Sequence, residues 1–181
     1  MKKFLIIGNV NAIIDKIMFP LIKDNKVWLG TQHIKEFVSD SSETKKFGNI
    51  RWFTNLDHNK RHSPIVLTQS YSSDRYPKYD NYGAINVDKV CDIPLDYDGI
   101  MGVPVSFMDK YCPEQFEIVG RCENLDTYSL KTKVYTSNEC KEAYYNKFGK
   151  SGVYDLNASG VLIKNGIKEK CFSRILIRLK K

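Results

Sequence analysis

The segment of residues 76–120 constrains the fold most, because it is dense in Tyr, Asp, Asn, Gly and Pro and lacks the period of a long helix. Two short apolar runs within it, residues 84–87 and 116–119, predict strands. The long stretch between these runs is interrupted by proline and glycine, and such a segment is usually functional or disordered. Its aromatic content argues against disorder. We therefore expect an ordered, irregular and functional segment here.

The apolar run KFLIIG at residues 3–8 has the length and continuity of a buried parallel strand. Asn9 and Asn11 follow at the carboxyl end of this expected strand, which is the edge where open α/β sheets bind ligands. Residues 12–22 have a helical spacing of apolar side chains, and Pro20 within them predicts a kink or a helix end just before it. Together these patterns predict an α/β fold.

Local patterns also predict the remaining elements. The pair Asn165-Gly166 suits a tight turn between the runs 161–164 and 172–179, which predicts a C-terminal hairpin. The other expected elements are a short strand at 27–30, a polar surface loop at 35–47, a strand at 49–55, a basic loop at 56–64, and a helix at 138–149 with Asn138 as its N-cap.

Size and charge restrict the possible functions. The 181 residues suffice for one domain with its own core, and the apolar fraction of 42% is typical of a soluble protein. A net charge of +7 and a pI of about 9.1 suit an anionic partner such as nucleic acid, and a solvated basic surface explains the charge equally well.

The five cysteines form no CxxC pair, which favours reduced thiols and a cytoplasmic protein. The histidines lack metal-ligand spacing, and no dinucleotide, P-loop or GxSxG motif occurs.

Three segments, residues 51–55, 60–62 and 75–82, mix cations with flat rings and amide groups. Cations neutralise phosphates, Asn and Arg read base edges, and rings stack on an extruded base. For any one ring a core position is the better interpretation, whereas the whole set in a basic chain favours DNA contact. The residues that we expect to contact DNA or the target base are Asn9, Asn11, Arg51, Trp52, Asn55, Lys78, Tyr79, Asn81 and Tyr82.

Five blocks follow one another along the chain: KKFLIIGN with Asn11-Ala12, FPLIKDNKVWLG, FGNIRWFTNL, YPKYDNYGAINV and IPLDYDGIMGVPVSFMDKYCPEQFEIVG. They resemble blocks of the adenine-specific DNA methyltransferases of the EcoRI type, over most of residues 1–120 and more weakly at 172–178. The resemblance implies a Rossmann-like methyltransferase fold and S-adenosylmethionine as the methyl donor. It also implies double-stranded DNA as the partner and the exocyclic amine of adenine as the acceptor.

The resemblance also exposes a gap. Enzymes of this kind need a glycine-containing element for the donor and a tetrapeptide [N/D/S]PP[F/Y/W], which binds the target amine and stacks on the flipped base. This sequence contains no Pro-Pro, and in the family the tetrapeptide precedes the block that resembles residues 2–9. We therefore expect the chain to be the carboxyl-terminal part of such an enzyme. We expect it to be inactive alone and to work with the missing amino-terminal part as a separate chain.

The expected organisation is one region, residues 1–181, with three parts. Residues 1–70 would hold late strands of a partial Rossmann-like methyltransferase sheet, residues 71–150 an irregular, strand-rich DNA-recognition segment, and residues 151–181 the C-terminal hairpin. Two alternatives stay open at this point. One is a non-catalytic DNA-binding module that works with a separate methyltransferase subunit, and the other is a structural or interaction protein whose aromatic residues form its core.

Overall fold

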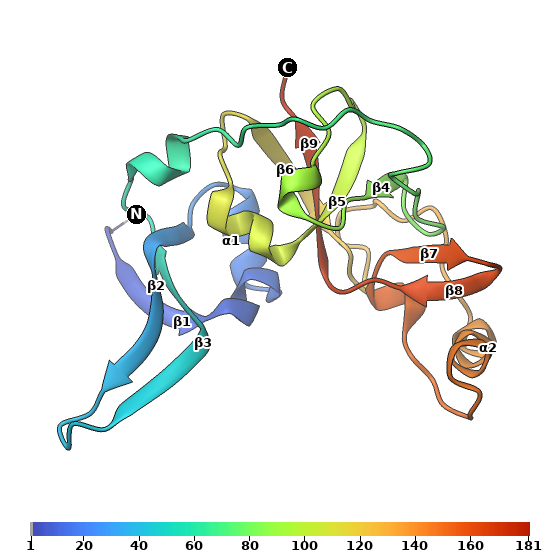
Figure 1. Cartoon of the computed structure of the whole chain (residues 1–181), viewed down its shortest axis with the longest axis horizontal. Helices are drawn as coiled ribbons and strands as arrows, with labels where there is room; N and C mark the ends of the chain where they lie inside the picture. Colours follow the sequence, from blue (N-terminus) through green and yellow to red (C-terminus); the bar gives the residue numbers. More distant parts are fainter. Residues whose placement is uncertain (1) are drawn as a thin grey trace. The chain divides into compact units, whose positions relative to one another are not determined.

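The computed structural model describes residues 2–181, which form two compact units. Unit 1 contains the chain up to Ile65 together with Met108–Glu114, and unit 2 contains Val66–Phe107 and Gln115–Lys181. The chain is mixed α/β and rich in strands, as expected in part from its sequence (Figure 1). None of the helices in residues 2–181 combines the length and the apolar character that crossing a membrane requires.

Unit 1 is organised around an antiparallel sheet with the strand order β1-β3-β2. One face of this sheet is packed: Phe53 is paired with Ile6 on one side and with Leu29 on the other, and Phe53 and Leu29 are buried. The preceding helical segments add the buried side chains of Ile13 and Phe19. The elements of unit 1 are β1 (Leu5–Asn9), η1 (Val10–Ile14), α1 (Met18–Lys23), β2 (Trp28–Val38), β3 (Thr44–Thr54) and η2 (Asn59–His62), and η4 (Val105–Lys110) has residues in both units.

The first strand is where expected, but its predicted surroundings are wrong. β1 runs antiparallel to β3, and it lies at an edge of the sheet. Leu5, Ile6 and Ile7 are about half exposed, at 52%, 47% and 46%. The apolar run therefore has the composition of a buried central strand, while the described residues leave it uncovered.

The single helix predicted at residues 12–22 is divided into η1 and α1. Asp15 causes the break, because its Oδ1 accepts hydrogen bonds from the backbone N–H groups of Ile17 and Met18 at 2.8 and 3.4 Å. α1 then begins at Met18, so Pro20 lies in its first turn, where a missing N–H costs nothing. The prediction that the helix ends just before Pro20 is therefore wrong.

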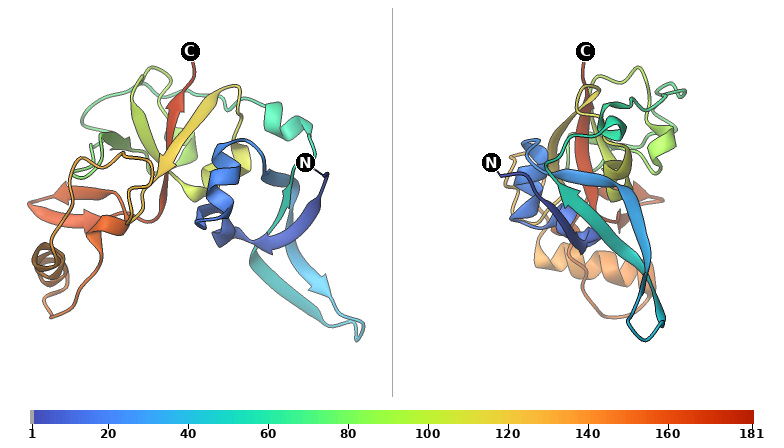
Figure 2. Two further views of the ribbon diagram at one scale, coloured as in Figure 1. Left: turned by 180° about the vertical axis from the view of Figure 1, so that it is seen from behind. Right: turned by 90° about the vertical axis from the view of Figure 1, so that its left-hand side faces the viewer.

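The prediction of a polar loop at residues 35–47 is also wrong, because this stretch forms the outer half of a long β2–β3 hairpin (Figure 2). The strands are joined by a short turn in which the Ser39 N–H donates to the Glu43 carbonyl at 2.9 Å. The strands here are exposed on both faces. Without a buried face there is no apolar alternation to reveal a strand in the sequence.

Unit 2 is organised around a sheet with the order β4-β5-β9-β6, in which β4 and β5 run parallel and the other neighbours antiparallel. A separate hairpin, β7–β8, and one longer helix complete the regular structure. The elements of unit 2 are β4 (Ala84–Asn86), η3 (Val90–Asp92), β5 (Ile100–Pro104), β6 (Phe116–Arg121), α2 (Ser137–Phe148), η5 (Leu156–Ala158), β7 (Val161–Lys164), β8 (Ile167–Lys170) and β9 (Arg174–Leu179).

The structure confirms the strands predicted near residues 84–87 and 116–119 and corrects what lies between them. The supposedly irregular stretch contains β5, whose Met101 and Val103 are fully buried. The strand β5 was not recognised in the sequence because it ends in Gly-Val-Pro, and glycine and proline are typical strand breakers.

The C-terminal hairpin is confirmed only for its first part. Asn165 and Gly166 have φ of 52° and 77°, which suits the expected tight turn, but the second strand is β8 rather than residues 172–179. Those last residues contain β9, which joins the main sheet between β5 and β6. β9 belongs there because Ile175, Leu176 and Ile177 are fully buried.

The helix predicted at residues 138–149 is confirmed as α2, with a correction at its start. Thr136 is the N-cap: its side chain accepts from the Glu139 N–H at 3.3 Å, and the Glu139 carboxylate accepts from the Thr136 N–H at 2.9 Å. Gly149 closes the helix in the left-handed conformation, as expected. Asn138 therefore lies inside the helix.

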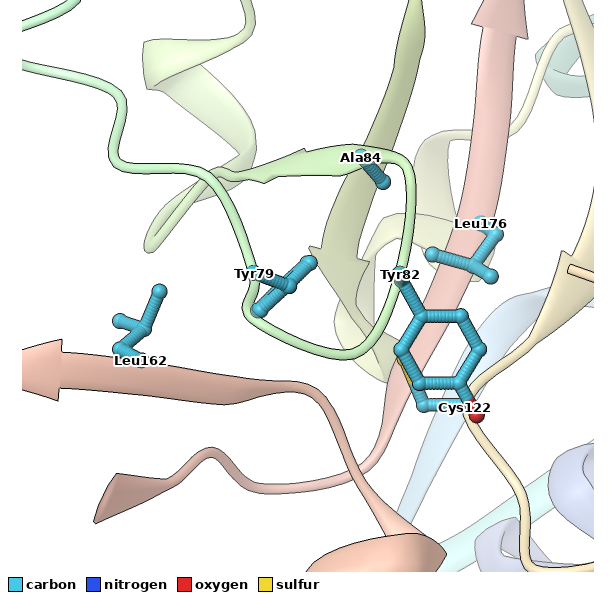
Figure 3. Packing of buried hydrophobic residues seen from close by; sticks show 6 residues of the cluster. All are labelled: Tyr79, Tyr82, Ala84, Cys122, Leu162 and Leu176. Atoms are coloured by element: carbon cyan, nitrogen blue, oxygen red, sulfur yellow. The ribbon is translucent and has the colours of Figure 1, made fainter. Parts of the chain in front are cut away.

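The tyrosine-rich segment of unit 2 is part of its core. Tyr79, Tyr82 and Ala84 pack with Cys122, Leu162 and Leu176, so this cluster joins the main sheet to the β7–β8 hairpin (Figure 3). Within the described residues, β4 and β5 are the only neighbouring named strands that run parallel. The fold is therefore mixed α/β, and the partial Rossmann-like sheet expected from the sequence is not confirmed.

Candidate nucleic-acid interface

The face of the unit 1 sheet opposite Phe53 is open along β1. Trp52 in β3 pairs with Ile7 in β1, and Thr54 pairs with Leu5, so alternation directs these four side chains to the open face. Leu5 and Ile7 remain about half exposed there. The β1 part of this face is therefore apolar and not covered by the described residues, whereas Thr54 in β3 is only 2% exposed.

A cavity of about 260 Å³ opens on this face beside Trp52. Leu5, Trp52 and Leu56 line it together with polar residues that include Thr31 and His58. Its volume lies just below the roughly 300 Å³ at which pockets for drug-sized ligands begin. The cavity therefore has room for a group smaller than a drug-sized ligand.

Two neighbours fix the shape of this cavity. A Cβ atom at Gly30 would lie 2.8 Å from Cβ of Trp52, so only glycine allows the two strands to hold Trp52 where it is. His58 is anchored by Nε2, which lies 2.9 Å from the carbonyl oxygen of Leu29. Its buried Nδ1 has no hydrogen-bond partner among residues 2–181. If Nε2 donates to that carbonyl, Nδ1 is an unpaired acceptor that is closed to solvent.

Arg51 is next to Trp52 but is held within the protein. Its Nε lies 3.4 Å from Oδ1 of Asp109, and its side chain is only 15% exposed. The same carboxylate oxygen lies 3.2 Å from Nε2 of His33. Arg51 also donates to the carbonyl of Ile50 at 2.9 Å. Its guanidinium group therefore neutralises Asp109, and this reduces its capacity to bind a phosphate.

The side chains of two asparagines predicted in unit 1, Asn9 and Asn55, hold the ends of β1. Asn9 Oδ1 accepts a hydrogen bond from the Asn11 N–H at 2.9 Å and caps η1. Asn55 Oδ1 accepts from the Phe4 N–H at 2.8 Å, and its Nδ2 donates to the Lys2 carbonyl at 2.8 Å. Asn9 and Asn11 are exposed, whereas Asn55 is partly buried and occupied by these bonds.

The residues predicted in unit 2 are mostly buried. Tyr79, Asn81 and Tyr82 are 5%, 0% and 2% exposed, and burial raises the pKa of both phenols. The Tyr79 hydroxyl donates to Asn86 Oδ1 at 2.7 Å, and the Tyr82 hydroxyl donates to the Glu123 carbonyl at 3.2 Å. These three side chains therefore organise the core of unit 2, and their expected contact with DNA stays a prediction.

Lys78 is the member of that segment that faces solvent. Of the five predicted residues in unit 1, Trp52 alone lines the cavity, and of the four in unit 2, Lys78 alone is exposed. The sequence analysis missed the other cavity residues, above all Gly30 and His58. A signal for Gly30 existed, because a glycine in a strand often marks a close approach of another chain segment.

The chain was also compared with known proteins. A family model described as the adenine-specific methyltransferase EcoRI matches residues 1–180. The chain belongs to this EcoRI family of adenine-specific methyltransferases. The resemblance found in the sequence is thereby confirmed.

Curated relatives within the EcoRI family match at substantial identity. The chain is 45% identical over 150 residues to the type II methyltransferase M.EcoRI of Escherichia coli, a match that covers 71% of this chain and 46% of that relative. It is 33% identical over 159 residues to the type II methyltransferase M.MpnI of Mycoplasma pneumoniae, covering 74% and 49% of the two chains. The chain thus spans about half the length of the curated relatives it matches. No solved structure matches it significantly.

Proposed function

We propose that the chain is the DNA-binding, carboxyl-terminal portion of a site-specific adenine DNA methyltransferase of a restriction–modification system. In this proposal it supplies one wall of the pocket for the target base and transfers no methyl group by itself. The observation that carries the proposal is the cavity beside Trp52, which opens on an uncovered apolar face in a chain of this family. Double-stranded DNA is the partner, and the cytoplasm, where free cysteines persist, is the location.

Trp52 has the chemistry for a flipped base. Enzymes that modify a base extrude it from the helix and hold it by stacking and by hydrogen bonds to its edge. In the cavity, the indole ring would provide the stacking surface, and the lining side chains of Thr31 and Gln32 would provide hydrogen-bonding groups. Because Leu5 and Ile7 on this face remain about half exposed, the cavity has one wall here and needs a second from elsewhere.

The methyl donor does not fit the described residues. Methyltransferases of this family use S-adenosylmethionine, and a glycine-containing loop after a parallel strand is the element expected to hold it. Of the two parallel strands, β4 is followed by Val87-Asp88-Lys89 and β5 leads directly into η4, and neither connection contains glycine. Asn9 and Asn11, the polar residues after β1, follow an exposed antiparallel strand. We therefore assign donor binding to the part of the enzyme outside this chain.

The uncovered edge of unit 1 supports an association with that part. β1 is an edge strand with three consecutive apolar residues half exposed, and soluble proteins avoid such edges because they invite strand pairing. We propose that a polypeptide carrying the amino-terminal half of the enzyme covers β1 and completes the cavity.

DNA binding is tested by measuring affinity for a duplex over a series of salt concentrations. We expect binding that weakens steeply with salt, and Lys78→Ala should reduce the slope of log K against log salt by about one unit, the loss of one phosphate contact. Lys150→Ala, which removes an exposed cation after α2, is the matched control and should leave the slope unchanged. Absence of duplex binding by the unaltered chain contradicts the proposal and leaves a structural or interaction protein.

The same series includes Arg51→Ala. A slope lowered by about one unit would assign its guanidinium group to phosphate. An unchanged slope would leave it the role of holding Asp109, which the short distance between them favours.

A second candidate function is a non-catalytic DNA-binding module that acts with a separate methyltransferase subunit. The exposed apolar residues of β1 favour association with another polypeptide in this case too. An upstream reading frame that encodes the Pro-Pro tetrapeptide would show that the two chains are parts of one enzyme.

A further inference from the structure

The outer part of the β2–β3 hairpin, residues 34–49, is a two-stranded ribbon. β1 pairs with β3 only from Ile50 to Thr54, so the ribbon extends beyond the third strand (Figure 2). Its strands pair with each other, as in Phe37 with Lys45 and Val38 with Thr44. The hairpin is longer than the unit 1 core requires, because these residues are exposed on both faces.

The two faces of the ribbon differ in charge. Phe37 lies opposite Lys45, and the rings of Phe37 and Phe47 meet edge to face with their centroids 5.4 Å apart. These three side chains therefore share one face. Alternation along β2 places Lys35 on that face as well. The opposite face carries Glu36 paired with Lys46, together with Val38 and Thr44. The acidic Asp40 and Glu43 lie in or beside the turn.

One face of the ribbon therefore carries two lysines and two aromatic rings, and its acidic residue, Glu43, lies at the turn beside Ser39. Phe37 and Phe47 are 38% and 37% exposed and have no core behind them. Such a face complements DNA: the ammonium groups can neutralise phosphates, and the rings can contact apolar parts of the bases. A two-stranded ribbon also fits the major groove, which is about 12 Å wide.

We propose that the ribbon is a DNA-contacting element whose Lys35, Phe37, Lys45 and Phe47 face lies against the duplex. This inference rests on the proposed DNA binding of the whole chain and locates one part of the surface responsible for it. In this arrangement Lys35 and Lys45 contact the phosphates of one DNA strand. The rings of Phe37 and Phe47 point toward the groove.

The sharpest test compares Lys45→Ala with Lys46→Ala, because these neighbours remove the same charge from opposite faces of one ribbon. Binding to duplex DNA is measured over a series of salt concentrations. Lys45→Ala should reduce the slope of log K against log salt by about one unit, and the double variant Lys35→Ala/Lys45→Ala should reduce it by about two. Lys46→Ala should leave this slope unchanged. Phe37→Ala should weaken binding without changing the slope. Since these side chains are exposed, the free energy of unfolding of the lysine variants should stay within about 0.5 kcal/mol.

The outcomes separate this inference from the proposed function. One outcome is that the unaltered chain binds DNA with an affinity that falls steeply with salt, and that Lys45→Ala and Lys46→Ala show equal slopes of log K against log salt. This outcome overturns the assignment of the ribbon face while DNA binding stands. No duplex binding by the unaltered chain overturns the proposed function and the ribbon with it. Equal slopes together with self-association that is lost on Phe37→Ala would assign the ribbon to contacts between copies of the chain, against the proposal.

Discussion

Replacing Asn81 with alanine is expected to lower the free energy of unfolding by about 3 kcal/mol, because it leaves two buried backbone groups unpaired. Asn81 is fully buried; its Nδ2 donates to the Ser159 carbonyl at 2.8 Å, and its Oδ1 accepts from the Val161 N–H at 2.9 Å. These bonds join the tyrosine-rich segment to the start of β7.

The measurement is urea denaturation followed by far-ultraviolet circular dichroism, since both tryptophans, Trp28 and Trp52, lie in unit 1 and do not report on unit 2. Asn146→Ala, an exposed position in α2, is the control and should change the stability by no more than about 0.5 kcal/mol. A loss below about 1 kcal/mol for Asn81→Ala would mean that its two bonds are not formed, which would return Asn81 to the DNA-contacting candidates.

Replacing Phe53 with alanine is expected to cost about 3–5 kcal/mol, the usual range for emptying a buried aromatic site. Phe53 is 1% exposed and lies in the middle strand of the unit 1 sheet, paired with Ile6 and Leu29. Because Trp52 alternates with Phe53, the packed face below holds the cavity above it in shape. The variant should therefore lose both stability and the defined surroundings of Trp52.

Tryptophan fluorescence during urea denaturation reads this effect directly, because both indoles belong to unit 1. Ile7→Ala, on the open face of the same sheet, is the matched control and should cost about 1 kcal/mol or less, since Ile7 is already half exposed. Similar losses for the two variants would show that Ile7 is as buried as Phe53 and that the face is not open.

Local patterns predicted the elements whose signals are local. The Asn165-Gly166 turn, the helix that ends at Gly149 and the buried strands β4 and β6 were all recognisable from short stretches. The correct N-cap of α2 was recognisable as well, because Thr136 and Glu139 form the capping-box pattern.

Other parts depended on tertiary context. The run at residues 5–7 has the composition of a central strand, and nothing in it reveals that β3 would be its antiparallel partner and that its other edge would stay uncovered. The outer hairpin was missed for the opposite reason, because its strands have no buried face. β9 pairs with strands far away in the sequence, so its sheet could not be predicted from its neighbours.

The candidate site was predictable by residue type but not by location. Tyrosines and asparagines in residues 79–82 have the chemistry to bind a base, and they equally satisfy a buried polar network, as they do here. Only the positions of neighbouring strands separate these roles. Trp52 was predicted and does lie beside a cavity, because it alternates with a buried phenylalanine.

We propose that this chain binds a DNA duplex and forms one side of a pocket for the target base, while the groups that bind the methyl donor and the target amine belong to another part of the enzyme. The most direct measurement incubates the purified chain with duplex DNA and S-adenosylmethionine labelled in its methyl group. We expect the chain to retain the duplex in a salt-dependent manner and to transfer no label to adenine. Label incorporated into adenine by the chain alone would contradict the account.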